Sequence, residues 1–251
     1  MQRYFVPDSN WMDHKVIITG DDAHHIARVM RLKKDDQIIC NHPNGQAAIC
    51  ILQNVGPNEV HAIIYRWLER SAELPVQVTI AQGLPKSNKF EFVLQKGTEL
   101  GADGFIPFRA ARSVVVWDDK KTVKKMKRYE KILKEASEQS HRNKIPYIKA
   151  PMTIEELIDE SVAYDIKLYA YEEEAKTSTF HSLSSVLQTL KNRERILVCI
   201  GPEGGFSPDE AKMLTDAGFH KVRLGPRILR TETASIYVLA SISYHLEELG
   251  G

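Results

Sequence analysis

The sequence contains little that would cross-link the chain or tie it to a membrane. Its 251 residues include only three cysteines, with no close pair and no His/Cys spacing typical of a zinc site. No apolar run approaches the roughly 18 residues of a membrane span, and residues 1–7 lack the basic and apolar stretches of a signal peptide. We therefore expect no disulfide framework, no metal and no membrane anchor. The three thiols, Cys40, Cys50 and Cys199, suit the reducing cytoplasm.

Net charge is also nearly absent, but the charges are unevenly distributed. The whole chain carries +1, whereas residues 109–149 contain 13 Lys/Arg and 5 Asp/Glu, a local net charge of +8. Such a concentration is expected of a face that binds a polyanion. For residues 120–134 alone, a solvated helix face is an equally good interpretation. The cations that we expect to contact nucleic acid are Arg109, Arg112, Lys124, Lys125, Arg128 and Arg142.

Residues 1–72 have the pattern of a small β-rich domain. Short apolar runs alternate with turn clusters that contain glycine, proline and asparagine. A helix is predicted from Asp21 or Asp22 to about Leu32, with Ile26, Val29 and Met30 on its buried side. The predicted strands include residues 16–18, 37–40, 47–52 and 59–64, and short strands with one helix suggest a small barrel.

The pattern of apolar and polar residues changes at residues 71–75, so we place a second domain at residues 73–251. Apolar strands there alternate with helices, which predicts an α/β fold with a parallel sheet covered on both faces. Asn88 is placed to cap a helix, with Glu91 three residues further on. The long basic helix would turn Val123 and Met126 inward. Strands are predicted at residues 76–81, 104–108, 165–169, 196–200 and 221–224.

The segment 200–210, IGPEGGFSPDE, is the most informative part of the chain. A buried strand ends there in a glycine-rich turn, and Ser207, Pro208 and Glu210 have the spacing of a helix start with a capping box. Glycines allow a sharp turn or the close approach of a ligand, and open α/β sheets bind ligands at the carboxyl ends of their strands. The spacing fits neither nucleotide phosphate-loop pattern. A plain tight turn is the alternative.

The segment 224–234, LGPRILRTETA, follows another predicted strand and precedes a long apolar helix to about Leu249. It places two arginines, a glutamate and two threonines around an Ile-Leu pair, a composition that suits a cleft. A salt bridge between Arg230 and Glu232 at the helix start is the structural alternative. Further cations that suit phosphate contact stand at Lys86 and Lys89, and His25, Arg28 and Arg31 give the first domain a basic helix edge.

These two glycine-containing segments together closely resemble those of the RsmE family. Its members are uridine N3-methyltransferases of bacterial 16S ribosomal RNA and belong to the SPOUT superfamily. The similarity extends along the whole chain. Further matching stretches are residues 3–5 (RYF), 24–32 (HHIARVMRL), 96–101 (KGTELG) and 138–142 (EQSHR).

The resemblance implies a fold and a cofactor. The second domain would be a SPOUT domain with a deep trefoil knot, and the first a PUA-like RNA-binding barrel. The functional unit would be a homodimer, and the substrate would be one uridine of 16S ribosomal RNA in the small ribosomal subunit. S-adenosyl-L-methionine would bind in the knotted loops, against Gly201, Gly204, Gly205, Leu224, Gly225, Ile228 and Leu229.

The chemistry of methylation at uracil N3 suggests roles for the charged residues of the two segments. Uracil N3 is a poor nucleophile until its imide proton leaves, so catalysis needs in-line positioning and a base. Glu232 is the candidate base and Arg230 the candidate for holding a uracil oxygen; exchanged roles, or Glu203 as base, remain open. A SPOUT ribose 2′-O-methyltransferase acting on rRNA or tRNA, and a non-catalytic RNA-binding ribosome assembly factor, are the alternative functions.

Overall fold

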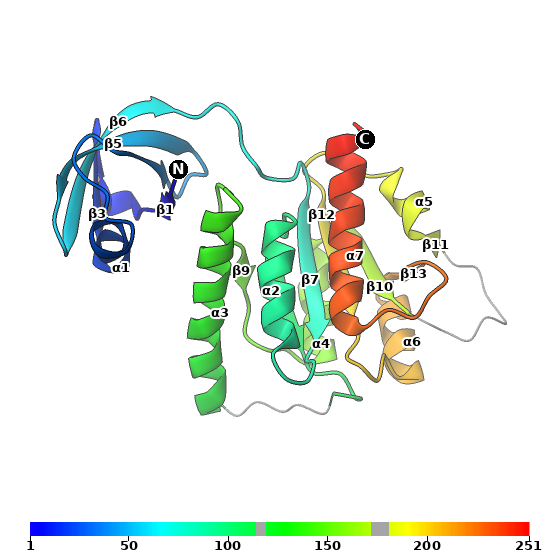
Figure 1. Ribbon diagram of the computed structural model, residues 1–251. Coiled ribbons are helices and arrows are strands. Elements are labelled where there is room, and N and C mark those ends of the chain that lie inside the picture. The colour runs from blue at the N-terminus through cyan, green and yellow to red at the C-terminus, as the bar shows by residue number, and fades with distance from the viewer. Residues whose placement is uncertain (114–118, 172–180, 251) are drawn as a thin grey trace. The chain divides into compact units, whose positions relative to one another are not determined.

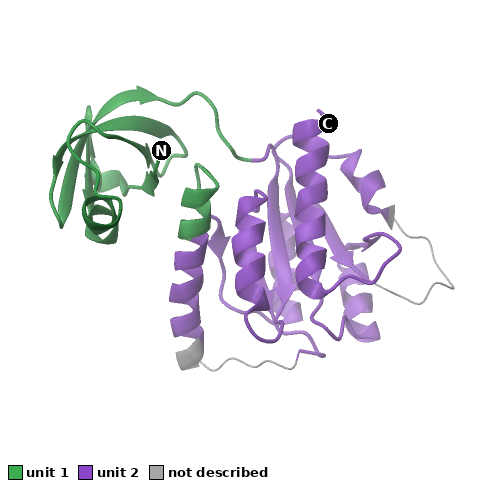
Figure 2. Cartoon of the chain, viewed as in Figure 1, with its two compact units in different colours: residues 1–73, 134–145 green, residues 74–133, 146–251 purple. Residues whose placement is uncertain are grey.

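The computed structural model describes residues 1–113, 119–171 and 181–250, in which the chain forms two compact units (Figures 1 and 2). One unit contains Met1–Glu73 together with Lys134–Ile145, and the other contains Leu74–Leu133 and Pro146–Gly251. Each unit therefore collects two separate stretches of sequence. The first unit corresponds to the expected β-rich domain with one added segment from later in the chain.

The first unit is a curled sheet of six strands (Figure 1) in the order β1-β4-β5-β6-β3-β2. The edge strand β1 pairs with β4 in parallel, and the other neighbours pair in antiparallel fashion. Its helix α1 continues as a π-helical turn that ends at Val29, before the expected end at Leu32. The elements are β1 (Arg3–Phe5), β2 (Trp11–Met12), β3 (Lys15–Thr19), α1 (Gly20–His24), β4 (Gln37–Asn41), β5 (Ala47–Val55) and β6 (Glu59–Trp67).

A buried polar network attaches the later segment to this sheet. Nη1 of Arg3 donates to the side-chain oxygens of Asn41 (3.2 Å) and Asn143 (2.9 Å) and to the carbonyl oxygen of Arg142 (3.0 Å). The guanidinium of Arg142, which is 3% exposed, forms an ion pair with Glu73. Glu73 also accepts a hydrogen bond from the backbone N–H of Asn143 at 2.8 Å. These bonds compensate for burying charged groups.

The second unit is built on a seven-stranded sheet in the order β11-β13-β10-β12-β7-β8-β9. Every pair of neighbouring strands in it is parallel, as the alternation of strands and helices predicted. Its strands are β7 (Gln77–Gly83), β8 (Gly104–Phe108), β9 (Tyr147–Ile148), β10 (Ile166–Ala170), β11 (His181–Ser182), β12 (Arg195–Ile200) and β13 (His220–Arg223). Its helices are α2 (Lys89–Glu99), α4 (Ile154–Glu160), α5 (Leu183–Leu187), α6 (Pro208–Asp216) and α7 (Thr231–Ser243), together with most of α3 (Asp119–Gln139).

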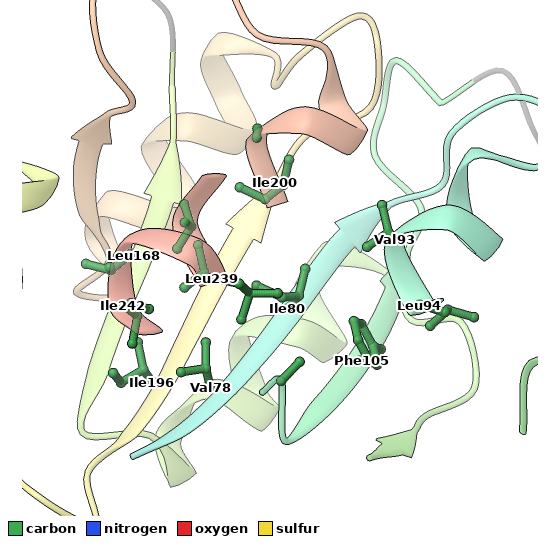
Figure 3. Packing of buried hydrophobic residues seen from close by; sticks show 14 of the residues in the cluster. Val78, Ile80, Val93, Leu94, Phe105, Leu168, Ile196, Ile200, Leu239 and Ile242 are labelled. Atoms are coloured by element: carbon green, nitrogen blue, oxygen red, sulfur yellow. The ribbon is translucent and has the colours of Figure 1, made fainter. Parts of the chain in front are cut away.

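Both faces of this sheet are covered, which explains its nearly continuous apolar strands. On β12, Val198 belongs to the core shared with α2, α3, α5 and α7, while the adjacent Leu197 belongs to the core on the α4 and α6 side. Figure 3 shows the first of these cores, where Leu239 and Ile242 of α7 pack over the strands. Successive residues of a strand point to opposite faces, so the sheet forms the central layer of three.

Some local expectations fail. Val29 and Val123, both expected on the buried side of a helix, are 60% and 61% exposed. Asn88 precedes α2 as expected, but its side chain makes no capping hydrogen bond, and Glu91 instead pairs with Arg128 at 2.7 Å. At each of these positions a side chain meets a partner or solvent that local spacing does not specify. The trefoil knot stays a prediction.

Candidate active site

Two loops of the second unit come together at one edge of its sheet. The first, residues 201–207, follows β12, and the second, residues 224–230, follows β13. Both strands flank β10 and run parallel, so their carboxyl ends lie at the same edge, where open α/β sheets bind ligands. The two segments singled out in the sequence therefore share one place in the fold.

These loops line a cavity of about 480 Å³, a size typical of small-molecule sites. Its wall combines apolar side chains, loop backbone and a few charged groups. The lining residues are Lys89, Arg112, Ala170, Tyr171, Ile200, Gly201, Pro202, Glu203, Gly204, Gly205, Phe206, Val222, Leu224, Ile228, Leu229, Arg230, Thr231 and Ala234. Every expected cofactor-contact residue is among them except Gly225, which instead forms the turn with a φ of +85°.

The glycine-rich loop is fixed where it meets α6. At its end, α6 begins with the predicted capping box: the Ser207 side chain accepts from the backbone N–H of Glu210, whose carboxylate accepts from the backbone N–H of Ser207. Within the loop, Gly205 has a φ of +65°, a conformation that favours glycine. A Cβ added at Gly204 would lie 2.9 Å from Cβ of Arg112. Position 204 of the loop thus has no room for a side chain.

A cluster of one ammonium and two carboxylates lies beside the cavity. Nζ of Lys89 is 2.9 Å from Oε1 of Glu203 and 3.4 Å from Oε2 of Glu232. Lys89 is the first residue of α2, and Glu232 lies in the first turn of α7. The ion-pair partner of Glu232 in the described structure is therefore Lys89 rather than Arg230.

The two carboxylates differ in how fully they are paired. Glu203 accepts hydrogen bonds from Lys89 and from the backbone N–H of Lys86 at 3.2 Å. Partial burial favours the neutral acid, but these bonds outweigh it, so the pKa of Glu203 lies below its ordinary value. Oε2 of Glu232 is buried, and no donor among the described residues reaches it in hydrogen-bonding geometry. Of the two, Glu232 keeps the freer oxygen.

A buried polar network lies directly behind this cluster. The side-chain amide of Gln82, at the end of β7, donates to Oγ1 of Thr231 at 2.7 Å and accepts from Oγ of Ser235 at 2.5 Å. Oγ1 of Thr231 in turn donates to the carbonyl oxygen of Gly201 at 2.6 Å. The first turn of α7, which contains Glu232, is thereby bonded to both β7 and the glycine-rich loop. Sequence reasoning missed Gln82, because its partners are distant in the chain.

The structure separates the expected RNA-contact residues into several groups. Arg112 joins the cavity, where its guanidinium donates to the carbonyl oxygen of Gly204 at 2.9 Å, and Lys89 joins the carboxylate cluster. Arg142 is buried in the first unit, where the ion pair with Glu73 occupies it. The imidazole of His25 is hydrogen-bonded to the Tyr4 hydroxyl at 3.0 Å. Of the remaining residues, Arg28, Arg31, Lys86, Arg109, Lys124 and Arg128 are exposed, whereas Lys125 is half-buried.

Within residues 1–113, 119–171 and 181–250, no group of three His, Cys, Asp or Glu side chains is placed to hold a metal ion. None of the helices described is both long and apolar enough to cross a membrane.

Comparison with known families shows what class of protein this fold and cavity define. A sequence model of an RNA methyltransferase domain matches residues 72–243, and a model of an RNA methyltransferase PUA domain matches residues 18–65. The parallel-sheet unit with its glycine-rich cavity is thus a methyltransferase domain. The curled sheet of the first unit is the PUA-like domain that the sequence predicted.

Full-length relatives define the family. The chain is 44% identical, over its whole length and 99% of the relative, to ribosomal RNA small subunit methyltransferase E of Bacillus subtilis. It is 33% identical to the protein of that name in Mycobacterium tuberculosis, with 90% of this chain and 85% of the relative covered. The chain belongs to the ribosomal RNA small subunit methyltransferase E family.

Solved structures agree with this assignment. The fold is similar to that of ribosomal RNA small subunit methyltransferase E from Neisseria gonorrhoeae, which was solved with bound S-adenosyl methionine. That comparison has a TM-score of 0.83 at 27% identity and covers 99% of this chain and 98% of the other. A methyltransferase from Legionella pneumophila with the same bound cofactor has a TM-score of 0.82 at 28% identity, with 96% of each chain covered.

Proposed function

We propose that this protein transfers the methyl group of S-adenosyl-L-methionine to N3 of one uridine in 16S ribosomal RNA of the small subunit. Membership of the family supports the reaction class, and the names of the relatives support the ribosomal RNA substrate. The observation that carries the chemistry is the buried, weakly paired carboxylate oxygen of Glu232 beside the glycine-rich cavity.

The cavity has the features that this cofactor requires. Leu224, Ile228 and Leu229 supply an apolar wall for an adenine ring, and the backbone of Gly201 and Gly204 is open to close approach. The carboxylate of Glu203 lines the cavity and that of Glu232 lies beside it, so either can face a positively charged group of the ligand. Gly205 and Gly225 set the turns that present these walls. The residues present therefore fit a sulfonium-bearing nucleoside.

The bound cofactor supplies an electrophilic methyl group on a sulfonium. The sulfur keeps the electrons of the broken C–S bond, so the thioether leaves without assistance from the protein. The chain's residues then have two tasks, to hold N3 in line with the methyl carbon and to take the N3 proton. A carboxylate oxygen of Glu232 accepts that proton as the N–C bond forms. Glu203 is a weaker candidate, because Lys89 and a backbone N–H already bind its carboxylate and lower its pKa.

The charge that develops on the uracil needs a cation within reach. Arg230 lines the cavity at the residue before α7, and its planar guanidinium can donate two hydrogen bonds to a uracil oxygen. Lys89, paired with both carboxylates, holds the side chain of Glu232 beside the cavity. We assign Arg230 and Glu232 the catalytic roles on this basis.

The remaining cations provide phosphate contacts along the RNA. Exposure supports this role for Arg28, Arg31, Lys86, Arg109 and Lys124. Arg112 and Lys89 would act at the cavity itself, and Arg128, Lys125 and His25 at the edges of their helices. We leave out Arg142, because a buried guanidinium bonded to Glu73 has no access to a phosphate.

Exposed apolar side chains around α7 support a homodimer. Ile228 is 86% exposed, Tyr237 40% and Tyr244 59%. Large apolar side chains that are exposed together are typical of a surface that binds another protein. A second copy of the chain would cover them. Light scattering on the eluting protein tests this inference, since a monomeric mass at micromolar concentration would contradict it.

The test of the reaction is nucleoside analysis of 16S ribosomal RNA after incubation with the protein and the cofactor. N3-methyluridine is the expected product. A methyl group on the sugar fragment would indicate a ribose 2′-O-methyltransferase. If the protein neither binds the cofactor nor forms a methylated product, it is an assembly factor. Glu232→Gln should slow single-turnover transfer by roughly 10²–10⁴-fold at saturating RNA. High pH should restore part of that rate, because the uracil then ionises unaided. An unchanged rate would make Glu232 a structural partner of Lys89.

A further inference from the structure

A second cavity lies entirely within the first unit and far in sequence from the catalytic loops. It measures about 390 Å³ and has walls from three separate stretches of chain, residues 5–7, 41–43 and 143–145. Its side chains include Phe5, His42 and Lys144. None of the roles assigned so far uses this cavity.

Stacked aromatic rings continue from the wall of this cavity. The rings of Trp11 and Trp67 are stacked, with centroids 5.5 Å apart and planes 18° from parallel. His42, which lines the cavity, meets Trp11 edge-on at 4.9 Å. The indole N–H of Trp11 donates to the carbonyl oxygen of Val6, another lining residue, at 3.1 Å. The cavity and the rings thus form one surface.

Much of this surface is both rigid and accessible. Trp67 is 41% exposed at the end of β6, although a ring of its size would gain by burial. Trp11 is held by its hydrogen bond, and the floor of the cavity is held because the amides of Asn41 and Asn143 are already bonded to Arg3. A preformed surface loses little entropy when a ligand binds.

The chemistry of the surface fits an unpaired nucleobase with its phosphate. Aromatic faces stack on bases of any sequence, and a nearby cation binds the backbone. Exposed Lys144 supplies that cation at the rim. The polar edge of His42 is taken, because its Nε2 lies 3.2 Å from a carboxylate oxygen of Asp8 and its Nδ1 accepts from the backbone N–H of Asn44. The surface therefore offers ring faces and shape more than hydrogen bonds.

We propose that the cavity at residues 5–7, 41–43 and 143–145, together with the Trp11–Trp67 stack, binds an unpaired nucleotide of the substrate RNA by stacking, with little preference for the base. The proposal rests on the proposed function for the RNA class of its ligand. It adds a contact for single-stranded RNA on the PUA-like unit, which would orient the RNA for methylation without touching the reacting atoms.

The first test measures binding alone, with full-length protein and no cofactor. In a Trp117→Phe background, tryptophan fluorescence excited at a wavelength that tyrosine does not absorb reports only Trp11 and Trp67. Trp117 lies outside the described residues. Single-stranded RNA of about ten nucleotides should quench this signal at the concentrations at which polarisation of labelled RNA shows binding. Saturated polarisation without quenching would overturn the proposal even if every variant below misfolded.

The second test compares matched variants. Trp67→Ala should weaken binding roughly 5- to 100-fold, whereas Trp67→Phe, which keeps a ring, should retain most of it. Lys144→Gln should lower the slope of log affinity against log salt by about 0.7, and Lys34→Gln, an exposed lysine of the same unit away from the cavity, should not. Wild-type affinity in Trp67→Ala would refute the stacking site.

Turnover separates this proposal from the proposed function. Trp67→Ala should raise KM for RNA and leave the single-turnover rate at saturating RNA unchanged. Glu232→Gln should lower the single-turnover rate and leave KM for RNA unchanged. Either inference can therefore fail while the other holds. If Trp67→Ala binds free RNA normally but binds the small ribosomal subunit poorly, the occupant is a protein segment, and the RNA proposal is wrong.

Discussion

Replacing Gln82 by Leu tests whether the buried network behind the carboxylate cluster determines the stability of the catalytic unit. Leu has a similar volume and no polar atoms, so the change removes the bonds to Thr231 and Ser235 while leaving little cavity. Gln82 is fully buried, and water cannot replace it. Oγ of Ser235 keeps only a long contact to the carbonyl oxygen of Thr231 at 3.5 Å.

The expected cost follows from the two hydroxyls that lose their partner. A buried polar group left unsatisfied costs about 1–3 kcal/mol. Thr231 keeps its bond to the carbonyl oxygen of Gly201 and loses only a donor, so we expect a total of about 2–4 kcal/mol in the free energy of unfolding. For a unit of this size that corresponds to a fall in Tm of roughly 4–16 °C. Affinity for the cofactor should fall too, because Thr231 lines the cavity.

Calorimetry on three variants measures these quantities. Gln77→Leu is the matched control, since Gln77 lies on the same strand but is exposed, and its unfolding free energy should stay within about 0.5 kcal/mol of wild type. Adding Ser235→Ala to Gln82→Leu removes one orphaned hydroxyl and should recover about 1–2 kcal/mol relative to additivity. If Gln82→Leu matches the Gln77 control in Tm and in cofactor affinity, the network does not hold the site.

Four further outcomes follow from groups already described. Gly204→Val should abolish cofactor binding in calorimetry while the protein stays folded by circular dichroism, because its side chain would collide with Arg112. Arg142→Ala should lower the free energy of unfolding by about 1–3 kcal/mol, because the half-buried Glu73 loses its ion-pair partner and keeps only backbone N–H donors such as that of Asn143. By contrast, Lys124→Ala should leave stability unchanged and reduce the salt slope of RNA binding by roughly 0.7–0.9. Folding lowers the pKa of Glu203 below its ordinary 4.5. The ionised carboxylate therefore stabilises the protein above pH 4.5, and this stabilisation is lost as the pH falls through the pKa of the folded state. Glu203→Gln should accordingly flatten the acid side of a plot of Tm against pH.

The parts of the fold that depend on local sequence were predictable. The runs at β7, β8 and β12 are apolar because both faces of the sheet are covered, so these strands and their parallel arrangement follow from composition. The start of α6 also follows from its sequence, because all partners of the capping box lie within four consecutive residues. The two glycine-containing loops were placed at strand ends, where the cavity is found.

Features that depend on distant partners were not predictable from one sequence. Lys89 pairs with two carboxylates more than a hundred residues away, and local spacing indicates only a phosphate contact. Arg142 belongs to a basic segment, but its guanidinium is buried against Glu73. A charged side chain looks the same in sequence whether water or a buried partner satisfies it, so net charge alone overestimates a binding face.

The segment Lys134–Ile145 has a consequence for how the chain matures on the ribosome that makes it. The curled sheet is complete in sequence at Trp67, yet Arg3, Asn41 and Glu73 gain their remaining partners only when Arg142 and Asn143 have been synthesised. Until then Arg3 and Asn41 can bond only to each other and Glu73 lacks its bonds to the later segment, and closing that long loop delays folding. The RNA-binding unit should therefore become protease-resistant only after part of the methyltransferase unit has emerged, which couples the appearance of the two activities in time.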